Sequence, residues 1–201
     1  ALRRTLKYVV VSSLPPPFTI TGLSTSLDRL FGKTGSALQG CGAIAVNVGQ
    51  WIAAGFAGRP WTPATYHRIA SGMLDWLRRT GAHLGVPVAW MATQPFPLNR
   101  GGHGHGTDQS NAHRRSSNLI HCPPTDWRYP HVLQAYNLGV QAAARERNVA
   151  IIDLWTAAMH VFELSFDDLH YATGPLGNLH AALVVEWVLQ ALPPSNKSVH
   201  V

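Results

Sequence analysis

The stretch Gly42-Ala-Ile-Ala-Val-Asn-Val-Gly-Gln-Trp51 joins a continuous apolar run to a short polar segment. An apolar run without alternation, here residues 42–46, is typical of a parallel strand that helices cover on both faces. Asn47 and Gly49 follow at the carboxyl end of this predicted strand. Because ligands in open α/β sheets bind outside the carboxyl ends of the strands, the sequence predicts a site beside these two residues.

Two later apolar runs, residues 86–92 and 149–153, have the same character, and a helical pattern precedes each of them. In the first helix Thr62 is a predicted N-cap with Pro63 at the first helical position, and Gly81 is expected to end the helix. Apolar residues recur at helical spacing in both helices, namely Tyr66, Ile69, Met73, Leu74 and Leu77 in the first and Leu133, Tyr136, Val140 and Ala144 in the second. This alternation predicts an α/β fold with a mostly parallel sheet and helices on both faces.

The two ends of the chain add a further predicted strand and a last helix. Residues 7–12 are rich in valine and are stopped by three prolines, and residues 179–191 have an apolar helical pattern. We expect one domain over residues 1–194 and a disordered tail over residues 195–201. Because the chain opens at Ala1 without a methionine, we expect this domain to be incomplete at its N-terminus.

The composition is that of a globular chain with a scattered excess of basic residues. The 201 residues carry a formal net charge of +6 with neutral histidines, and 46% of them are hydrophobic. No lysine-rich tract or basic ladder with interleaved aromatic residues occurs, so we expect no nucleic-acid partner. No apolar stretch reaches the roughly 18 residues that a membrane span requires, so no span is predicted in this chain.

The cysteines and the histidine-rich stretch do not match a metal-binding pattern. Cys41 and Cys122 are too few for a zinc site, and whether they pair with each other stays open. His103, His105 and His113 lie in a long polar stretch, without a carboxylate or cysteine at a regular ligand spacing. We therefore expect no metal and no cofactor, and we interpret this stretch as a mobile lid or a loop that faces the substrate. A metal-dependent hydrolase that uses these histidines is a weaker alternative hypothesis.

Asp167 and His170 form the clearest candidate for acid–base chemistry. A carboxylate three residues before an imidazole can lie on the same side of one turn. There it can hold the ring in one tautomer and stabilise its protonated form. The alternative is a surface aspartate and a loop histidine that never meet a substrate, because a D-x-x-H pattern is short and common.

Several residues at the predicted strand ends are candidates for binding. The Asn47 amide can donate to an oxyanion and Gly49 lets the backbone approach closely, although Asn47 could equally cap the turn. Thr93 lies in the loop after residues 86–92, and the aromatic face of Trp51 can stack on a sugar, although most tryptophans belong to the core. At the end of the third run, Asp153 is expected to cap the segment that follows.

Four sequence blocks, taken in order, resemble the SGNH/GDSL hydrolase superfamily. They are most similar to its PC-esterase branch, which includes the plant trichome-birefringence-like proteins. The blocks cover about residues 40–192 and are Ala43-Ile-Ala-Val-Asn-Val-Gly-Gln-Trp51, Val88-Ala-Trp-Met-Ala-Thr-Gln-Pro95, Tyr136-Asn-Leu-Gly-Val-Gln-Ala142 with Ile151-Ile-Asp153, and Asp167-Asp-Leu-His-Tyr171.

This resemblance implies a three-layer α/β/α, flavodoxin-like fold and a Ser-His-Asp esterase or O-acyltransferase. His170 would be the general base, Asp167 its orienting acid and Asn47 an oxyanion donor. The implied substrates are acylated glycans or other small esters, commonly acetyl groups on sugar hydroxyls, handled without a metal. The resemblance also implies a Golgi or extracellular setting.

The Gly-Asp-Ser block that carries the nucleophile in this family occurs nowhere in the 201 residues. One hypothesis is that the serine lies in a part of the protein outside this chain. The other hypothesis is a catalytically inactive, SGNH-like protein that binds glycan through the same cleft.

Overall fold

The computed structural model describes residues 27–53, 61–95, 130–159 and 174–192. Within these ranges three strands form one parallel sheet in the order β1-β2-β3. The strands are β1 (Ile44–Val46), β2 (Val88–Met91) and β3 (Ala150–Ile152). Each of them lies inside one of the apolar runs, so the prediction of an α/β fold with a parallel sheet is confirmed. The run at residues 7–12 lies outside the described residues.

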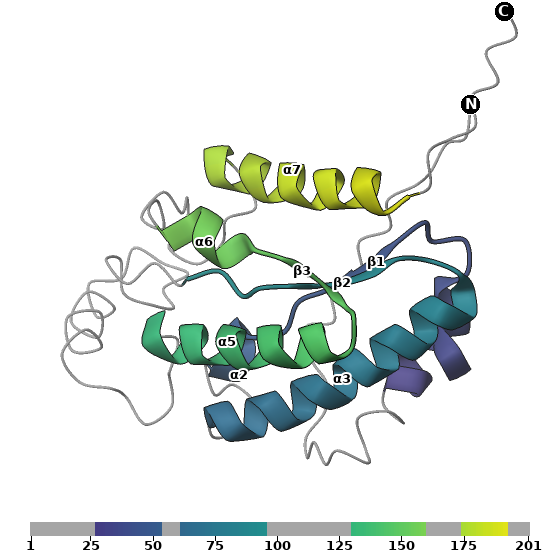
Figure 1. Ribbon diagram of the computed structural model, residues 1–201, viewed down its shortest axis with the longest axis horizontal. Helices are drawn as coiled ribbons and strands as arrows, with labels where there is room; N and C mark the ends of the chain where they lie inside the picture. Colours follow the sequence, from purple (N-terminus) through teal and green to yellow (C-terminus); the bar gives the residue numbers. More distant parts are fainter. Residues whose placement is uncertain (1–26, 54–60, 96–129, 160–173, 193–201) are drawn as a thin grey trace, which may run out of the picture.

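Helices cover both faces of this sheet (Figure 1). Helices α3 and α5 cross one face, whereas α7 lies on the other face. Residues 27–31 are also helical. The remaining elements, in chain order, are η1 (Lys33–Leu38), α2 (Gln50–Ala53), α3 (Pro63–Leu84), α5 (Pro130–Glu146), α6 (Leu154–Met159) and α7 (Gly174–Ala191).

The alternation of side chains along the strands divides the apolar residues into two layers. Trp90 belongs to the large core beneath α3 and α5, whereas its neighbour Ala89 belongs to a smaller cluster on the other face. Ile151 and Ile152 divide in the same way. Successive side chains of a strand point to opposite faces, so a strand with helices on both sides must be apolar at consecutive positions.

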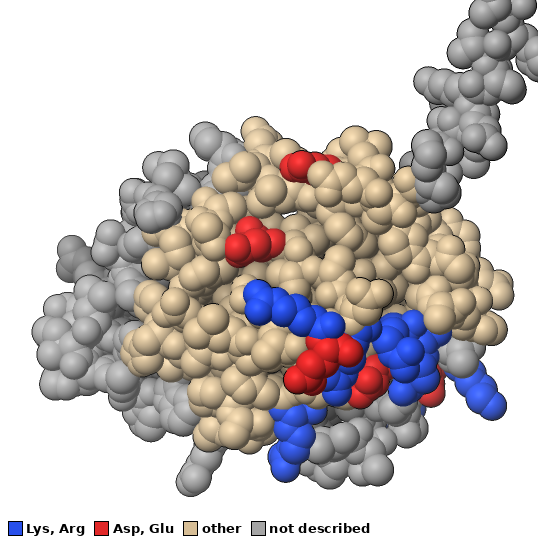
Figure 2. Space-filling model, viewed as in Figure 1, with Lys and Arg blue, Asp and Glu red and all other residues tan. Residues whose placement is uncertain are grey.

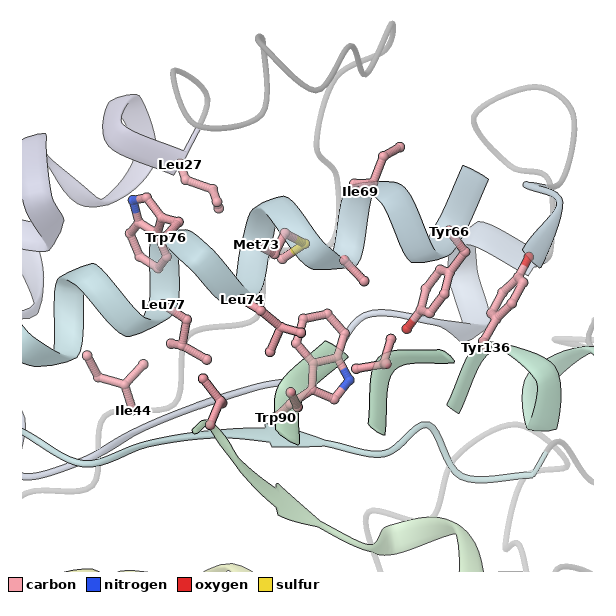
Figure 3. Close-up of a cluster of buried hydrophobic side chains, with 14 of the residues drawn as sticks. Leu27, Ile44, Tyr66, Ile69, Met73, Leu74, Trp76, Leu77, Trp90 and Tyr136 are labelled. Carbon is pink, nitrogen blue, oxygen red and sulfur yellow. The ribbon is translucent and has the colours of Figure 1, made fainter. Parts of the chain in front are cut away.

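The main core is built from the apolar stripes of α3 and α5. Every residue predicted for these stripes is buried. Figure 3 shows Leu74 and Leu77 pointing from α3 toward the sheet, where Trp90 lies with 1% of its surface exposed. The rings of Tyr66 and Tyr136 stack at the junction of the two helices, with 4.0 Å between their centroids and 9° between their planes.

Helix α3 begins where it was predicted to begin and ends later. The Thr62 side chain accepts a hydrogen bond from the Thr65 amide at 3.2 Å, and Pro63 is the first helical residue. The predicted end at Gly81 is wrong, because the helix continues to Leu84 and ends at Gly85, which has a left-handed φ of 66°. Gly81 serves packing instead, since a Cβ there would lie 2.4 Å from Val88 Cγ1.

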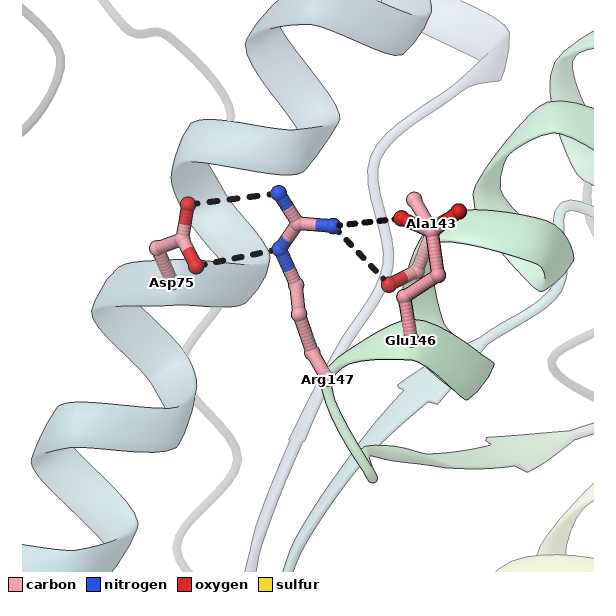
Figure 4. A network of polar contacts seen from close by, with 4 residues as sticks. All are labelled: Asp75, Ala143, Glu146 and Arg147. Atoms are coloured by element: carbon pink, nitrogen blue, oxygen red, sulfur yellow. Dashed lines mark hydrogen bonds and ion pairs between the residues drawn. The ribbon is translucent and has the colours of Figure 1, made fainter.

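An ion pair also joins α3 to the segment after α5 (Figure 4). Arg147 donates to both carboxylate oxygens of Asp75, at 3.0 and 3.4 Å, and to the Ala143 carbonyl at 3.1 Å. Glu146 lies 3.5 Å from the same guanidinium. Figure 2 shows acidic and basic side chains interleaved on this face, over the junction of α3 and α5. Such partly exposed pairs stabilise a fold only modestly.

Helix α7 contacts the second face of the sheet with one side and leaves apolar side chains exposed on another. Leu183, Val184 and Trp187 pack against the cluster around Ala89. Leu189 on the outer side is 71% exposed. Among the residues that the structure describes, no helix combines the length and the apolar character needed to cross a membrane.

Candidate functional site

The carboxyl ends of β1 and β2 lie side by side and carry a set of linked polar groups. We call this set the strand-end cluster. It draws on the loop after β1, the residue two positions after β2, and the facing helices α3 and α5, which is where a parallel sheet presents its binding residues. Its members are Asn47, Val48, Gly49, Tyr66, Thr93, Tyr136 and Asn137.

Asn47 is the exposed member of the strand-end cluster. Its amide nitrogen donates to the Met91 carbonyl at 2.9 Å, across from β1 to β2. The same nitrogen lies 3.5 Å from Thr93 Oγ1, at the outer limit of a hydrogen bond. The bond to the Met91 carbonyl therefore orients the amide, and the contact with Thr93 adds little to it.

Thr93 and Gly49 are the buried residues next to Asn47 in the strand-end cluster. The Thr93 side chain has 0% of its surface exposed, and its hydroxyl donates to the Val48 carbonyl at 3.3 Å. Gly49 is buried against it, and a Cβ at Gly49 would lie 2.0 Å from Thr93 Oγ1. The two candidates that sequence placed at separate strand ends are therefore in direct contact.

Two tyrosines, one from α3 and one from α5, are the members of the strand-end cluster on the side of the helices. The Tyr66 hydroxyl donates to the Val48 carbonyl, and the Tyr136 hydroxyl donates to the Trp61 carbonyl just before α3. Burial raises the pKa of Tyr66 above its ordinary range, a hydrogen bond with Thr93 opposes this shift, and Tyr136 adds to it. Burial likewise raises the pKa of Tyr136. Both phenols therefore stay protonated donors at neutral pH.

Asn137, which sequence analysis did not single out as a site residue, completes the strand-end cluster. It lies in the buried stripe of α5 with 4% of its surface exposed. Its Oδ1 accepts from the Thr93 amide at 2.8 Å, and its Nδ2 donates to the Thr93 carbonyl at 2.9 Å. The available signal was a polar residue beside Tyr136 within an apolar helical stripe, because a buried amide requires partners.

The remaining predicted site residues have different outcomes. Asp167 and His170 lie outside the described residues, as do Cys122 and the histidine-rich stretch. Trp51 belongs to α2, but the position of its side chain is not among the described features. Asp153 caps α6, as predicted, because its Oδ1 accepts from the Thr156 amide at 2.9 Å.

The strand-end cluster provides hydrogen-bond donors rather than acids or bases. Its side chains are amides, a hydroxyl and protonated phenols, and among them only the exposed Asn47 amide is placed to orient a polar group or stabilise negative charge. Across residues 27–53, 61–95, 130–159 and 174–192, no group of three or more His, Cys, Asp or Glu side chains could hold a metal ion.

No protein-family model, no curated protein and no solved structure matches this chain.

Proposed function

We propose that this chain contributes the α/β domain of an SGNH-type esterase or O-acyltransferase that acts on acylated carbohydrates. In this proposal the sheet belongs to a three-layer, flavodoxin-like fold, and Asn47 donates to the oxyanion. The observation that carries the proposal is the Asn47 amide, exposed and oriented at the carboxyl end of β1 beside the end of β2. Donors fixed before the reaction stabilise developing charge better than donors that must reorganise.

The proposed reaction proceeds through an acyl-enzyme. His170 takes the proton of a serine hydroxyl, and the serine oxygen forms a bond to the ester carbonyl carbon. The carbonyl oxygen becomes an oxyanion, which accepts a hydrogen bond from the exposed Asn47 amide in place of the weak contact with Thr93. The intermediate then expels the sugar oxygen, which takes the proton from His170. Water or an acceptor hydroxyl next gives a proton to His170 and attacks the acyl carbon, and the serine oxygen leaves and takes that proton back. Asp167 orients His170 throughout.

The nucleophile is proposed to lie in a part of the full-length protein outside these 201 residues. This proposal is supported by the order of the other blocks, which matches the family pattern although Gly-Asp-Ser is absent from the sequence. Thr93 does not serve as the nucleophile in this scheme, because its hydroxyl is fully buried and donates to Val48. Its proposed contribution is to support the loop that carries Asn47 and Gly49.

The test compares the full-length protein with its His170→Ala variant in the hydrolysis of p-nitrophenyl acetate. We expect a loss of about 10³-fold or more in turnover, as when one member of a catalytic triad is removed. Exposed His83, in the last turn of α3, supplies the matched control, and His83→Ala should retain the wild-type rate. An acetylated donor with a glycan acceptor tests transfer in the same variants. Equal rates for wild type and His170→Ala in both assays would remove the proposal.

A second candidate function is glycan binding without catalysis. It is favoured by the missing Gly-Asp-Ser and by the stronger hydrogen bond of the Asn47 amide, which goes to the protein's own Met91 carbonyl. Titration calorimetry with an acetylated oligosaccharide separates the two functions. Binding without turnover supports the second candidate, whereas a Gly-Asp-Ser block found upstream in the full-length sequence disfavours it.

A further inference from the structure

Asn137 is a buried polar side chain at a position where α5 otherwise presents apolar residues to the core. The neighbouring positions of its stripe, Leu133, Tyr136 and Val140, are fully or almost fully buried. An amide in such a place is tolerated only when its donor and acceptor find partners. Both partners of Asn137 belong to a single residue, Thr93.

Thr93 lies just beyond the last backbone hydrogen bond of the sheet on its strand. Strand β2 ends at Met91, and the Ala92 amide still donates to the Ile152 carbonyl of β3 at 2.9 Å. The next residue, Thr93, is paired through both its amide and its carbonyl with the Asn137 side chain, at 2.8 and 2.9 Å. The Asn137 amide therefore takes the place of a neighbouring strand and extends the fixed geometry of β2.

The fixed backbone of Thr93 in turn determines where its side chain lies. The Thr93 hydroxyl donates to the Val48 carbonyl at 3.3 Å and lies 3.5 Å from the Asn47 amide nitrogen. It also packs so closely against Gly49 that no Cβ would fit there. A continuous path of contacts thus runs from Asn137 of α5 through Thr93 to the exposed Asn47 amide after β1. The path contains no ionisable group that titrates near neutral pH.

We propose that Asn137 is a positioning residue of this site: it fixes Thr93, whose buried side chain in turn holds the Val48 and Gly49 backbone of the loop that carries Asn47. This inference rests on the function proposed above, and it adds a residue that would never touch the substrate. A misplacement of about 1 Å in a catalytic group can reduce a rate by about 10²-fold, so a supporting residue of this kind affects turnover from a distance.

The central variant is Asn137→Leu, which keeps the approximate shape of the side chain and removes both hydrogen bonds to Thr93. In the full-length protein we expect kcat to fall by about tenfold or more, with KM changed by less than about threefold, because the substrate does not contact this residue. The matched control is Leu133→Ala, which opens a cavity in the same helix at a residue with 0% exposure. It should leave kcat within about threefold of wild type at a temperature where both variants are folded.

The decisive comparison is a double-mutant cycle with Asn47→Ala. If Asn137 acts through Asn47, the change Asn137→Leu should cost less than about threefold in kcat once Asn47 is alanine. Full additivity of the two losses, or an unchanged kcat in Asn137→Leu, would overturn the inference while leaving the proposed function intact. A wild-type rate that does not depend on His170 would instead refute the proposed function, and the inference with it.

Nuclear magnetic resonance provides a structural measurement that does not depend on turnover. In Asn137→Leu the Thr93 amide should exchange with solvent at least tenfold faster, and the Asn47 side-chain signals should shift, whereas Leu133→Ala should leave both unchanged. Asn137→Asp serves as a second variant if Asn137→Leu does not fold. Its carboxyl group can accept from the Thr93 amide at any pH but donates to the Thr93 carbonyl only when protonated, so the exchange of Thr93 relative to an unstructured peptide at the same pH should slow as the pH is lowered. Asn47 signals that stay at their wild-type positions in the folded variant would overturn the inference.

Discussion

Gly49 and Thr93 are in contact so close that a Cβ at Gly49 would lie 2.0 Å from Thr93 Oγ1. Three atoms of the Thr93 side chain lie within 2.8 Å of that Cβ position, and Thr93 has 0% exposure. A buried side chain in a close-packed interior has little room to withdraw. Packing between two strand ends therefore requires glycine at this position, and the glycine brings the loop of Asn47 against the end of β2.

Gly49→Ala should lower the free energy of unfolding by about 1–3 kcal/mol, the usual cost of forcing an extra methyl group into a packed interior. Gly42→Ala is the matched control, because no heavy atom lies within 4 Å of a Cβ at that exposed glycine. Urea unfolding followed by tryptophan fluorescence measures both variants. Equal stability of the two variants would show that the contact between Gly49 and Thr93 is not tight.

A second glycine, Gly139, lies where α3 crosses α5. The effect of Gly139→Ala on stability should change sign when His67 is replaced by alanine. A Cβ at Gly139 would lie 2.0 Å from His67 Nε2, and this ring is held by the Ala135 carbonyl at 2.8 Å. Gly139→Ala should therefore destabilise the protein by about 1–2 kcal/mol, because the ring must leave its hydrogen bond or the helices must separate.

In a His67→Ala background the same change should stabilise the protein by up to about 1 kcal/mol, since alanine favours a helix over glycine. The free energies of unfolding of the four proteins in this cycle give the coupling directly. If Gly139→Ala has the same effect in both backgrounds, His67 is not the residue that requires glycine at the crossing.

The buried phenols predict how stability changes in alkali. Burial raises the pKa of Tyr66 and Tyr136 in the folded protein, whereas the phenols of an unfolded chain ionise near pH 10. Above about pH 10 the unfolded state loses protons that the folded state keeps. The free energy of unfolding should then fall by up to about 1.4 kcal/mol per pH unit for each tyrosine, and it should be insensitive to these groups below about pH 9.

Denaturant unfolding between pH 8 and pH 11 measures this slope. Tyr66→Phe should flatten it by removing the contribution of one phenol, although the loss of the hydrogen bond to Val48 lowers the stability at every pH. If the free energy of unfolding of Tyr66→Phe depends on pH in the same way as that of the wild type, the Tyr66 phenol does not cause this slope.

Local sequence signals were sufficient for the parts of the fold that depend on local physics. The apolar runs around Ile44, Trp90 and Ile152 predicted strands because consecutive apolar residues suit a strand with both faces covered. Thr62 and Pro63 predicted the start of α3, and Asp153 predicted a cap, because each depends on neighbours within three residues.

The features that sequence missed depend on partners far along the chain. Gly81 was expected to end a helix, but what determines its role is the contact with Val88, which only the folded packing supplies. The partner of Asn137 is Thr93, 44 residues away, and Asn47 likewise reaches 44 residues to Met91. A polar residue in an apolar stripe indicates that a partner must exist, but it does not indicate which one.

The central claim, that the Asn47 amide stabilises an oxyanion, is tested most directly by the turnover of Asn47→Ala in the full-length protein. Asn178→Ala, at an exposed asparagine of α7, is the matched control. We predict that Asn47→Ala lowers kcat for p-nitrophenyl acetate by about 10²–10³-fold with little change in KM, and that Asn178→Ala has the wild-type rate. A folded Asn47→Ala variant with an unchanged kcat would contradict the claim.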